Sequence, residues 1–503
     1  MIELRDYQKN QLNFINNKIN LTDILSIESP TGSGKTYVFF QFIKDWLSKK
    51  ENQLTNVVIT TGFNNLVYSL EQRAIEYGLS PKILIGYKAM NCPEVMKEKN
   101  LDYKPFTYPE QYHCNHKNEN GECQSTLDKY AEYSEEIKNG VGQLIITNHS
   151  TFLARQQLFK NASLLIIDEA HTFDNFYSTY VNLTLDQGDL MQLDQSINRV
   201  KEPMRSIIKL NMKNRKMLPT QQITPILNAT EDVRLKAKFK NFFETQPQLN
   251  NYIEHTSNSI TIHKFYKMFE LEIRPKIVLF SATIDAFTQN MFGVNKAFQY
   301  REYTQFCDYS KSEFIAIPNE DYERALKQFL DYVDVKIKKE NKSGLVLCTT
   351  ITDVNRTKKY DGYLGFKMFD DISSFIDYKG KKILVGSRAL FQGVDIPSLD
   401  FVSLNKIPFP NWDEKNQALQ EYLTDRGRNN FDPWKQFTIP KTENDIIQST
   451  GRLWRALDSK GIVSIFDHRI ERFSYIIRDT MDIHRHGIKI NIMDENGVRP
   501  FKI

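Results

Sequence analysis

The residues with the clearest chemical role form a phosphate-binding loop near the start of the chain. The stretch Ser29-Pro30-Thr31-Gly32-Ser33-Gly34-Lys35-Thr36 ends in the Gly-Lys-Thr of that motif, with Ser29 at the position of the first glycine. Backbone N–H groups of such a loop cradle phosphates, its lysine reaches the β- and γ-phosphates, and its threonine holds Mg²⁺. We therefore predict an ATP site formed by Thr31, Gly32, Ser33, Gly34, Lys35 and Thr36.

A pair of carboxylates is the expected partner of this loop. The apolar residues 164–167 lead directly into Asp168-Glu169-Ala170-His171. A short apolar run is typical of a buried strand, so the carboxylates are expected at a strand end. We predict that Asp168 contributes to the Mg²⁺ shell and that Glu169 polarises the attacking water as general base. His171 is expected to couple the nucleotide to a second domain.

A third set of candidates lies near residue 450. Residues 445–454 read as a helix that carries Gln448 and Arg452, with Arg455 close behind. Arginines three residues apart on a helix share one face. Arginines presented to a γ-phosphate stabilise the charge that develops during phosphoryl transfer. We therefore predict catalytic roles for Gln448, Arg452 and Arg455.

Near the N-terminus, Gln8 follows Arg5 and Tyr7 on an expected helix just before the first strand. A glutamine beside these residues could bind adenine through hydrogen bonds and stacking. An exposed polar helix face is an equally simple interpretation.

A candidate metal site lies in a loop-rich stretch between residues 86 and 140, which interrupts the α/β pattern. Three of the five cysteines fall there, Cys92, Cys114 and Cys123, together with His113 and His116. Three thiolates with one imidazole could hold Zn²⁺ or an iron–sulfur cluster. No Cys-x-x-Cys pair is present, so unligated thiols in a surface insertion are the alternative.

Short apolar runs that end in small polar residues supply the elements that position these groups. Such runs begin at residues 24, 56, 144, 164 and 276, and again at 344, 382 and 401. Several end in hydroxyl side chains, as in Thr60-Thr61-Gly62 and Ser281-Ala282-Thr283. Ligands of open α/β sheets bind beyond the carboxyl ends of the strands, and hydroxyl groups suit contacts to phosphate and sugar. The pattern predicts two α/β units.

The segment between residues 172 and 270 has a different character. Charged and amide residues dominate, and apolar residues such as Ile207, Leu210 and Ile253 recur at the spacing of an amphipathic helix. We expect a mostly helical insertion of about domain size. Basic residues from Arg199 to Lys216 could line a nucleic-acid channel or form a solvated helix face.

Length, charge and cysteine content limit the class of protein. A chain of 503 residues is expected to form two or three domains. Its net charge of only +4 means that nucleic-acid binding must depend on a local groove. No signal peptide, membrane-spanning run or disulfide framework is expected, which favours a reducing cytoplasm and no membrane contact.

The two α/β units divide the ATPase chemistry between them. The first carries the phosphate loop and carboxylates, and the second carries the arginines. Hydrolysis therefore requires the units to close on one another, which makes ATP a switch on their separation. Polar strand ends in both units could grip one nucleic-acid strand, so the division predicts a nucleic-acid motor.

The chain resembles the XPD/DinG family of superfamily 2 helicases. The resemblance spans nearly the whole chain in the family's order and rests on residues 5–8, 29–36, 147–149, 168–171, 281–283, 393–397, 406–410, 448–455 and 466–469. Two insertions are its more specific part. A cysteine-bearing segment precedes Asp168 and a helical segment follows it, as do the iron–sulfur and arch domains of the family.

The resemblance implies an α/β fold of two RecA-like parallel-sheet motor domains, with a Cys-bearing insertion and a helical arch-like insertion in the first. The expected boundaries are 1–85, 144–171 and 271–308 for motor domain 1, 86–143 for the metal-type insertion, 172–270 for the arch-like insertion, and 309–503 for motor domain 2. It also implies that Gly393 and Asp395 contact ATP. A [4Fe-4S] cluster is implied beside ATP and Mg²⁺, but this chain has three cysteines where the family has four, so zinc or no metal is the alternative.

The implied function is that of a DEAH-box, ATP-dependent DNA helicase. It would move 5′–3′ along single-stranded DNA and unwind tailed duplex DNA, in the cytoplasm of a bacterium and encoded by the bacterium or its phage. The alternative is a nucleic-acid-dependent ATPase or translocase that remodels DNA or protein–DNA complexes without strand separation. A nuclease is not expected, because the sequence shows no additional carboxylate cluster of the kind that a nuclease needs. A non-catalytic binding module is not expected either, because Lys35, Glu169 and Arg452 are all present.

Overall fold

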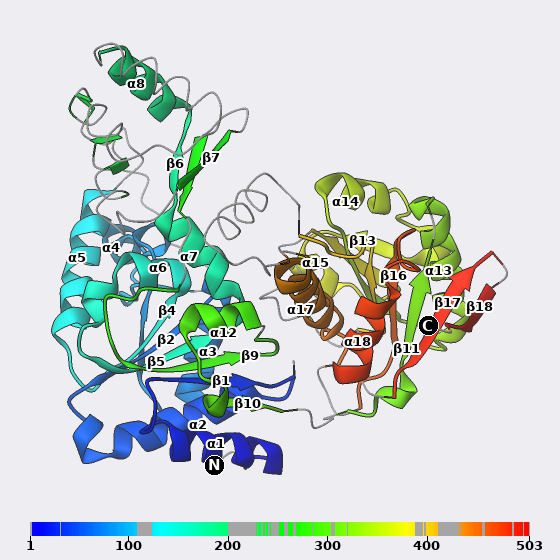
Figure 1. Cartoon of the computed structure of the whole chain (residues 1–503), viewed down its shortest axis with the longest axis horizontal. Coiled ribbons are helices and arrows are strands. Elements are labelled where there is room, and N and C mark those ends of the chain that lie inside the picture. The colour runs from blue at the N-terminus through cyan, green and yellow to red at the C-terminus, as the bar shows by residue number, and fades with distance from the viewer. Residues whose placement is uncertain are drawn as a thin grey trace.

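The computed structural model contains two α/β lobes side by side, with a small third sheet above the first lobe (Figure 1). The structure describes residues 3–30, 32–107, 123–199, 228, 230–232, 235–236, 238–239, 242, 251–255, 260–264, 268–284, 286–302, 307–318, 320–387, 396, 399–410, 432, 434–454, 458–484, 487–495 and 497–501. The predictions for Thr31, His113, Cys114, His116, Gly393, Asp395, Arg455 and the basic residues from Lys201 to Lys216 lie outside these residues.

The first lobe is built on a seven-stranded sheet with the order β10-β1-β9-β5-β2-β4-β3, and every neighbouring pair is parallel. Its strands are β1 (Ile24–Glu28), β2 (Asn56–Thr61), β3 (Pro81–Leu84), β4 (Leu144–Asn148), β5 (Ala162–Asp168), β9 (Lys276–Ser281) and β10 (Gln299–Arg301). Helices α1 (Asp6–Lys18), α2 (Lys35–Ser48), α3 (Asn64–Glu76), α6 (His149–Ala154), α7 (Phe173–Val181) and α12 (Ala286–Phe292) complete the lobe.

The apolar runs of the sequence become the central strands of this sheet. All six residues of β2 are buried, as are the last five residues of β5. Strands covered on both faces read as continuous apolar runs, because every side chain enters a core. The parallel order also brings the carboxyl ends of β1, β9 and β5 to one edge, where the predicted phosphate loop and carboxylates lie.

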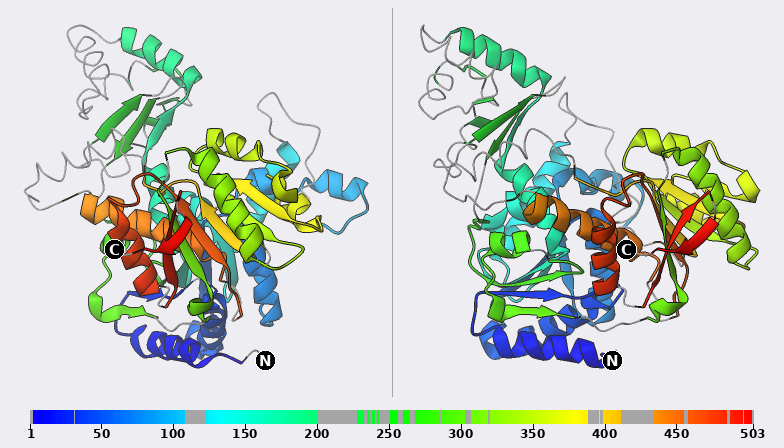
Figure 2. Two further views of the ribbon diagram at one scale, coloured as in Figure 1. Left: turned by 90° about the vertical axis from the view of Figure 1, so that its right-hand side faces the viewer. Right: turned by 45° about the vertical axis from the view of Figure 1, so that its right-hand side comes forward.

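Two segments lie between the strands of the first lobe. The cysteine-bearing segment contributes α4 (Pro93–Glu98) and α5 (Gln124–Asn139). The later segment contributes α8 (Gln187–Asn198) and a three-stranded antiparallel sheet of β6 (Leu183–Leu185), β8 (Ile260–Lys264) and β7 (Asn251–His255). This sheet projects away from both lobes (Figure 2).

The expectation that Ile253 lies on a helix is wrong, because it lies on β7 and pairs with Ile262 of β8. The period-two alternation at Leu183 and Leu185, and at Ile260 and Ile262, is the signal of a strand. These strands are too short for the alternation to stand out from the surrounding polar residues.

The second lobe contains an eight-stranded sheet with the order β13-β14-β12-β15-β16-β11-β17-β18, parallel except for the final antiparallel pair. Its strands are β11 (Glu313–Ile317), β12 (Ser343–Leu347), β13 (Lys367–Phe369), β14 (Lys382–Gly386), β15 (Phe401–Leu404), β16 (Ile462–Phe466), β17 (Lys489–Asp494) and β18 (Gly497–Pro500). The helices are α13 (Tyr322–Lys336), α14 (Ile351–Lys358), α15 (Ile372–Asp377), α17 (Ile439–Thr450) and α18 (Ser474–His484).

Alternate residues of these strands enter two separate apolar clusters, one on each face of the sheet. Phe314, Leu345 and Val463 belong to one cluster, and their neighbours Ile315 and Val346 belong to the other. The second lobe is therefore a three-layered α/β unit of its own. Among the described residues, no helix combines the length and the apolar character that a membrane crossing requires.

Candidate active site

The phosphate loop leaves β1 and ends at the start of α2. Gly32 and Gly34 have φ values of 80° and 77°, a left-handed conformation that glycine adopts without strain. A Cβ at Gly34 would lie 2.6 Å from Nε2 of Gln8, so the close approach also requires glycine. Lys35 is buried, and its Nζ donates to the carbonyl oxygens of Ser29 and Pro30 at 3.1 and 3.4 Å. The lysine is thereby held inside the curve of the loop.

Gln8 braces this loop. Its Nε2 donates to the carbonyl oxygens of Ser33 and Gly34 at 2.8 and 3.3 Å, and its Oε1 accepts from the backbone N–H of Arg5 at 2.9 Å. Tyr7 donates its hydroxyl hydrogen to the same Ser33 carbonyl at 2.9 Å. The structure thus gives Gln8 a role in positioning the loop, and adenine recognition stays a prediction.

Ser29, the departure from the usual first glycine, takes part in a second set of bonds. Its Oγ lies 2.6 Å from Oγ of Ser33 and accepts from Nε2 of Gln11 at 3.2 Å. Gln11 is buried and was not predicted from the sequence. The hydroxyl therefore ties the loop to α1 from within.

The two carboxylates stand at the end of β5, two strands from β1 and at the same edge. Asp168 is almost fully buried. Burial, and then the adjacent Glu169 carboxylate, raises the pKa of Asp168, whereas Lys35 opposes that rise. A buried carboxylate that lacks enough positive charge fits a divalent cation. Thr36 lies half-buried in the first turn of α2, and its hydroxyl is the second hard oxygen of the predicted Mg²⁺ site.

Glu169 is held in an unusual backbone conformation. Its φ of 52° and ψ of 47° are left-handed, which is rare for a residue with a side chain. Such strain persists where the surrounding structure enforces it, and it is concentrated at functional sites. Among the described residues, Oε2 of Glu169 is buried without a hydrogen-bond partner. A carboxylate oxygen that accepts no hydrogen bond from the protein suits a base that takes a proton from water.

His171 connects this edge to β9. Its Nδ1 lies 2.7 Å from Oγ of Ser281 and 3.4 Å from Oε2 of Glu169. The carbonyl of Ser281 accepts from the backbone N–H of Ser29 at 3.0 Å, and its Oγ accepts from the N–H of Thr283 at 3.3 Å. Ser281 therefore contacts His171, the phosphate loop and the hydroxyl-bearing turn.

His149 is a further buried residue at this edge. Its Nδ1 lies 2.9 Å from Oγ1 of Thr60, and its ring meets Phe173 and Phe176 edge to face. Burial, and then the nearby His171, lowers the pKa of His149 to about 3. His149 is therefore neutral at physiological pH and acts as a packing and hydrogen-bonding group.

Gln448 lies on α17 and Arg452 just after it, and α17 is the helix that faces the first lobe (Figures 1 and 2). Lys441 of α17 donates to Oδ1 of Asn175 in α7 at 3.3 Å, so the two lobes touch here. Gln448 and Arg452 are buried.

The expectation that Arg452 lies on a helix is wrong, because α17 ends at Thr450. Gly451 follows that end, and the chain then turns. The fully buried Trp454 draws the chain inward by donating from Nε1 to Oγ of Ser312 at 3.0 Å. The turn therefore forms because Trp454 is anchored in the core of the second lobe.

Two of the three predicted metal-binding cysteines come together. Cys92 precedes α4 and Cys123 precedes α5, and their sulfur atoms lie 4.0 Å apart. A tetrahedral Zn²⁺ with Zn–S bonds of about 2.3 Å separates its sulfur ligands by about 3.8 Å. The pair therefore fits one shared metal ion. Within the part of the chain that the structure describes, no group of three or more potential ligands gathers.

Comparisons with known proteins match both lobes. The helicase C-terminal domain family matches residues 322–480, and the type III restriction enzyme res subunit family matches residues 1–212. The ATP-dependent DNA helicase YoaA of Haemophilus influenzae is 22% identical over 432 residues, which cover 66% of this chain and 65% of that protein.

Other relatives match shorter shares of their own length. The ATP-dependent helicase DinG of Mycobacterium tuberculosis is 34% identical over 97 residues, which cover 18% of this chain and 14% of that protein. A 3′–5′ exonuclease DinG of Staphylococcus aureus is 22% identical over 376 residues, which cover 66% and 40%. The chain thus spans less than two-thirds of the length of these curated relatives.

Solved structures share the fold over nearly the whole chain. An apo XPD structure has a TM-score of 0.57 at 15% identity and covers 96% of this chain and 100% of that one. An XPD helicase of S. tokodaii has a TM-score of 0.55 at 14% identity and covers 97% and 100%. The sequence matches to both lobes, together with the XPD-like fold over nearly the whole chain, support an XPD/DinG-like superfamily 2 helicase.

Proposed function

We propose that this chain is an ATP-dependent DNA helicase that moves 5′–3′ along single-stranded DNA and separates tailed duplexes. One observation carries the proposal. A phosphate loop that holds Lys35 shares one sheet edge with the buried Asp168 and the backbone-strained Glu169, while Gln448 and Arg452 lie on the other lobe. Two half-sites of this kind make hydrolysis depend on the approach of the lobes.

The residues divide the work as follows. Lys35 and the loop amides bind the β- and γ-phosphates, and Asp168 with Thr36 holds the cation that neutralises phosphate charge. Glu169 orients the attacking water and accepts its proton, because its carboxylate oxygen is kept available at the strand end. Arg452, with Arg455, supplies positive charge from the second lobe. His171 and Ser281 transmit changes at Glu169 to β9.

The DNA substrate is supported by the printed function of the YoaA relative, and a bacterial setting by the sources of the relatives. The 5′–3′ direction and the cytoplasmic location follow only from the family resemblance. The half-buried Asn148 at the end of β4 is an amide of the kind that positions a nucleic-acid backbone. The small sheet of β6 to β8 stands above this lobe, where a strand-separating wedge is expected.

Strand displacement on three duplexes tests this function. The substrates carry a 5′ tail, a 3′ tail or blunt ends, and the proteins are the wild type, Lys35→Ala and Lys44→Ala. Lys44 is the matched control because it lies exposed on the same helix. We expect displacement only from the 5′ tail, abolished by Lys35→Ala and retained by Lys44→Ala. DNA-stimulated ATPase activity without displacement would favour the translocase, and displacement from a 3′ tail would refute the direction.

We also propose that Cys92 and Cys123 bind a metal together with Cys114 and either His113 or His116. The candidates are an iron–sulfur cluster and Zn²⁺, and the 4.0 Å sulfur separation favours the single ion. Metal analysis of purified protein should find near-stoichiometric zinc or iron, lost in Cys92→Ser but kept in Cys348→Ser, whose thiol lies in the second lobe. A metal-free, folded wild type would refute the site.

A further inference from the structure

Residues 307–312, which we call the connector, lead directly into β11, the first strand of the second lobe along the chain. The connector follows β10, the last strand of the first lobe. Tyr309 and Ser312 of the connector are buried, and the carbonyl of Tyr309 accepts the backbone N–H of Ser312 at 2.9 Å. The connector is therefore built into the core of the second lobe at the point where the chain arrives from the first.

The connector holds the indole ring of Trp454 from two sides. Oγ of Ser312 accepts from Nε1 of Trp454 at 3.0 Å, and it also accepts the backbone N–H of Gly461 at 3.3 Å. The ring of Tyr309 meets that of Trp454 edge to face, with the centroids 5.3 Å apart and the planes at 89°. We call Trp454, Ser312 and Tyr309 together the Trp454 anchor. All three residues lie at the amino edge of the second sheet, because Ser312 directly precedes β11.

Arg452 lies only two residues before this anchor. The backbone N–H groups of Arg452, Leu453 and Trp454 each donate to the carbonyl three residues earlier, at 3.4, 3.0 and 3.2 Å. Bonds of this kind tighten the last turn of a helix. Arg452 and Leu453 are also buried. The tightened turn therefore transmits the position of Trp454 to Arg452.

The start of α17 is fixed at the opposite, carboxyl edge of the same sheet. The turn Trp434–Thr438 leads directly into the helix. The ring centroid of Trp434 lies 5.4 Å from those of Phe409 and Phe473, and the Arg469 guanidinium lies 5.0 Å from the centroid of Phe409. Aromatic side chains therefore hold the chain just before α17.

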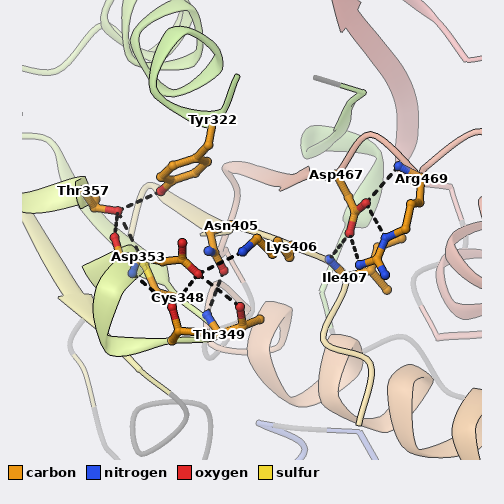
Figure 3. Close-up of polar contacts among 11 residues, drawn as sticks. Tyr322, Cys348, Thr349, Asp353, Thr357, Asn405, Lys406, Ile407, Asp467 and Arg469 are labelled. Carbon is orange, nitrogen blue, oxygen red and sulfur yellow. Dashed lines mark hydrogen bonds and ion pairs between the residues drawn. The ribbon is translucent and has the colours of Figure 1, made fainter. Parts of the chain in front are cut away.

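Ion pairs fix the loops at that carboxyl edge. Arg469 donates two bonds to Asp467 at 2.9 and 2.8 Å, and Asp467 also accepts the backbone N–H of Ile407 at 3.0 Å. Lys406 donates to Oδ2 of Asp353 at 3.1 Å. Figure 3 shows both pairs. The start of α17 thus has a frame of ion pairs and rings, whereas the turn at its end depends on the Trp454 anchor.

We propose that Trp454 is a positioning residue for ATP hydrolysis, which holds Arg452 at a place set by the connector. The inference rests on the proposed role of Arg452 in hydrolysis. A misplacement of about 1 Å at a catalytic group can cost about 10²-fold in rate. Because the connector is where the chain arrives from the first lobe, the anchor makes the place of the arginine depend on how the second lobe is attached.

Steady-state ATPase kinetics of matched tryptophan variants test the anchor. Trp454→Phe keeps a buried ring but removes the Nε1–H donor. Trp46→Phe is the control, because Nε1 of Trp46 donates in the same way to Oγ of Ser163, at 3.1 Å, near the amino end of β5. We expect Trp454→Phe to lower kcat about tenfold and to change KM for ATP less than twofold, because the phosphate loop is untouched. Trp46→Phe should leave both constants within about twofold of the wild type, although the two variants lose comparable thermal stability.

Ser312→Ala removes the acceptor and completes a double-mutant cycle. We expect Ser312→Ala to lower kcat about as far as Trp454→Phe, and the double variant to lower it no further, because residues in contact do not act additively. Wild-type kcat in Trp454→Phe, an equal fall of kcat in Trp46→Phe, or full additivity in the double variant would overturn the anchor.

Arg452→Ala separates this inference from the proposed function. Hydrolysis by Arg452→Ala at the wild-type rate would refute the proposed role of Arg452 and the anchor with it. Slow hydrolysis by Arg452→Ala, together with wild-type kcat in Trp454→Phe, would refute the anchor alone.

A second measurement needs no variant. Hydrogen–deuterium exchange of the wild-type protein is compared with bound ADP and with ADP plus aluminium fluoride, which mimics the phosphoryl group in transfer. We expect aluminium fluoride to slow exchange in peptides that contain residues 449–454 and also in those that contain residues 307–313. Slowing at 449–454 alone would overturn the link to the connector. Slowing in neither segment would refute the role of Arg452 as well.

Discussion

The carboxyl edges of the two sheets hold their acidic residues in opposite electrostatic states. In the first lobe, burial and Glu169 raise the pKa of Asp168, and Glu169 itself sits in a strained left-handed conformation. In the second lobe, hydrogen bonds overcome burial and lower the pKa values of two aspartates: bonds from Thr350 and then Lys406 act on Asp353, and bonds from Arg469 act on Asp467. The first edge is short of positive charge, whereas the second is paired.

This difference in charge compensation distinguishes a catalytic site in the first lobe from a structural arrangement of ion pairs in the second. Ionised carboxylates without sufficient compensation destabilise the fold but leave a place for a metal and a proton. Buried carboxylates with fixed cations stabilise the loops that carry them, because the ion pairs are also hydrogen-bonded. The first edge therefore gives up stability for catalysis, and the second keeps its cations and aromatics in fixed positions.

The largest expected effect concerns the reactive edge. Glu169→Gln keeps the size of the side chain but cannot accept a proton from water, so we expect kcat for ATP hydrolysis to fall about 10³-fold. The Kd for ATP should change less than threefold, measured by equilibrium binding of a fluorescent analogue. Glu76→Gln, on the exposed side of α3, is the control and should hydrolyse ATP like the wild type. Hydrolysis by Glu169→Gln at the wild-type rate would remove Glu169 from the site.

The next effect concerns the paired edge. Asp467→Asn leaves Arg469 without its buried counter-charge and weakens the bond to Ile407, at a cost of about 3 kcal/mol. Hydrogen–deuterium exchange should speed up in peptides that contain β11, β15 and β16, with little change in the first lobe. Asp377→Asn, which alters an exposed carboxylate at the end of α15, should leave exchange unchanged. Unaltered exchange in Asp467→Asn would show that the pair is not a stabilising frame.

The central strands, the phosphate loop and the position of Asp168 could be predicted from the sequence. Strands buried on both faces produce apolar runs, so β2, β5, β12 and β15 were predictable, and so was the place of Asp168 at a strand end. The phosphate loop was predictable because its chemistry demands glycines next to one lysine.

The remaining features depend on contacts between distant segments. The left-handed φ of Glu169 is not typical of a residue with a side chain, although its carbonyl accepts local bonds from the backbone N–H and the hydroxyl of Thr172. Trp434 and Phe473 are far apart along the chain, and their rings meet because the segments just before α17 and α18 lie together. Arg452 leaves the helix because Trp454 is buried against Ser312. In the last two cases tertiary packing overrides the local signal.

A smaller effect, of opposite sign, returns to Asp168. Asp168→Asn removes a buried charge that the fold disfavours, so we expect first-lobe stability to rise by about 1 kcal/mol without nucleotide. Thermal unfolding with ATP and Mg²⁺ should raise the melting midpoint of the wild type but not that of the variant, because ligand bound to the native state stabilises it. A variant less stable than the wild type without nucleotide would contradict the charge deficit.

The smallest effect is the pH dependence of that gain. The folded-state pKa of Asp168 lies above its unfolded value, so the penalty of the ionised carboxyl is present at high pH and disappears as pH falls toward the ordinary aspartate value near 4. The stability difference between Asp168→Asn and the wild type should therefore shrink from pH 8 to pH 5 in urea unfolding of the first lobe. Asp467 has a lowered pKa, so its contribution is present above the ordinary value and is lost only below it. The difference between Asp467→Asn and the wild type should accordingly stay constant from pH 8 to pH 5, and parallel pH profiles for the two variants would break the contrast between the edges.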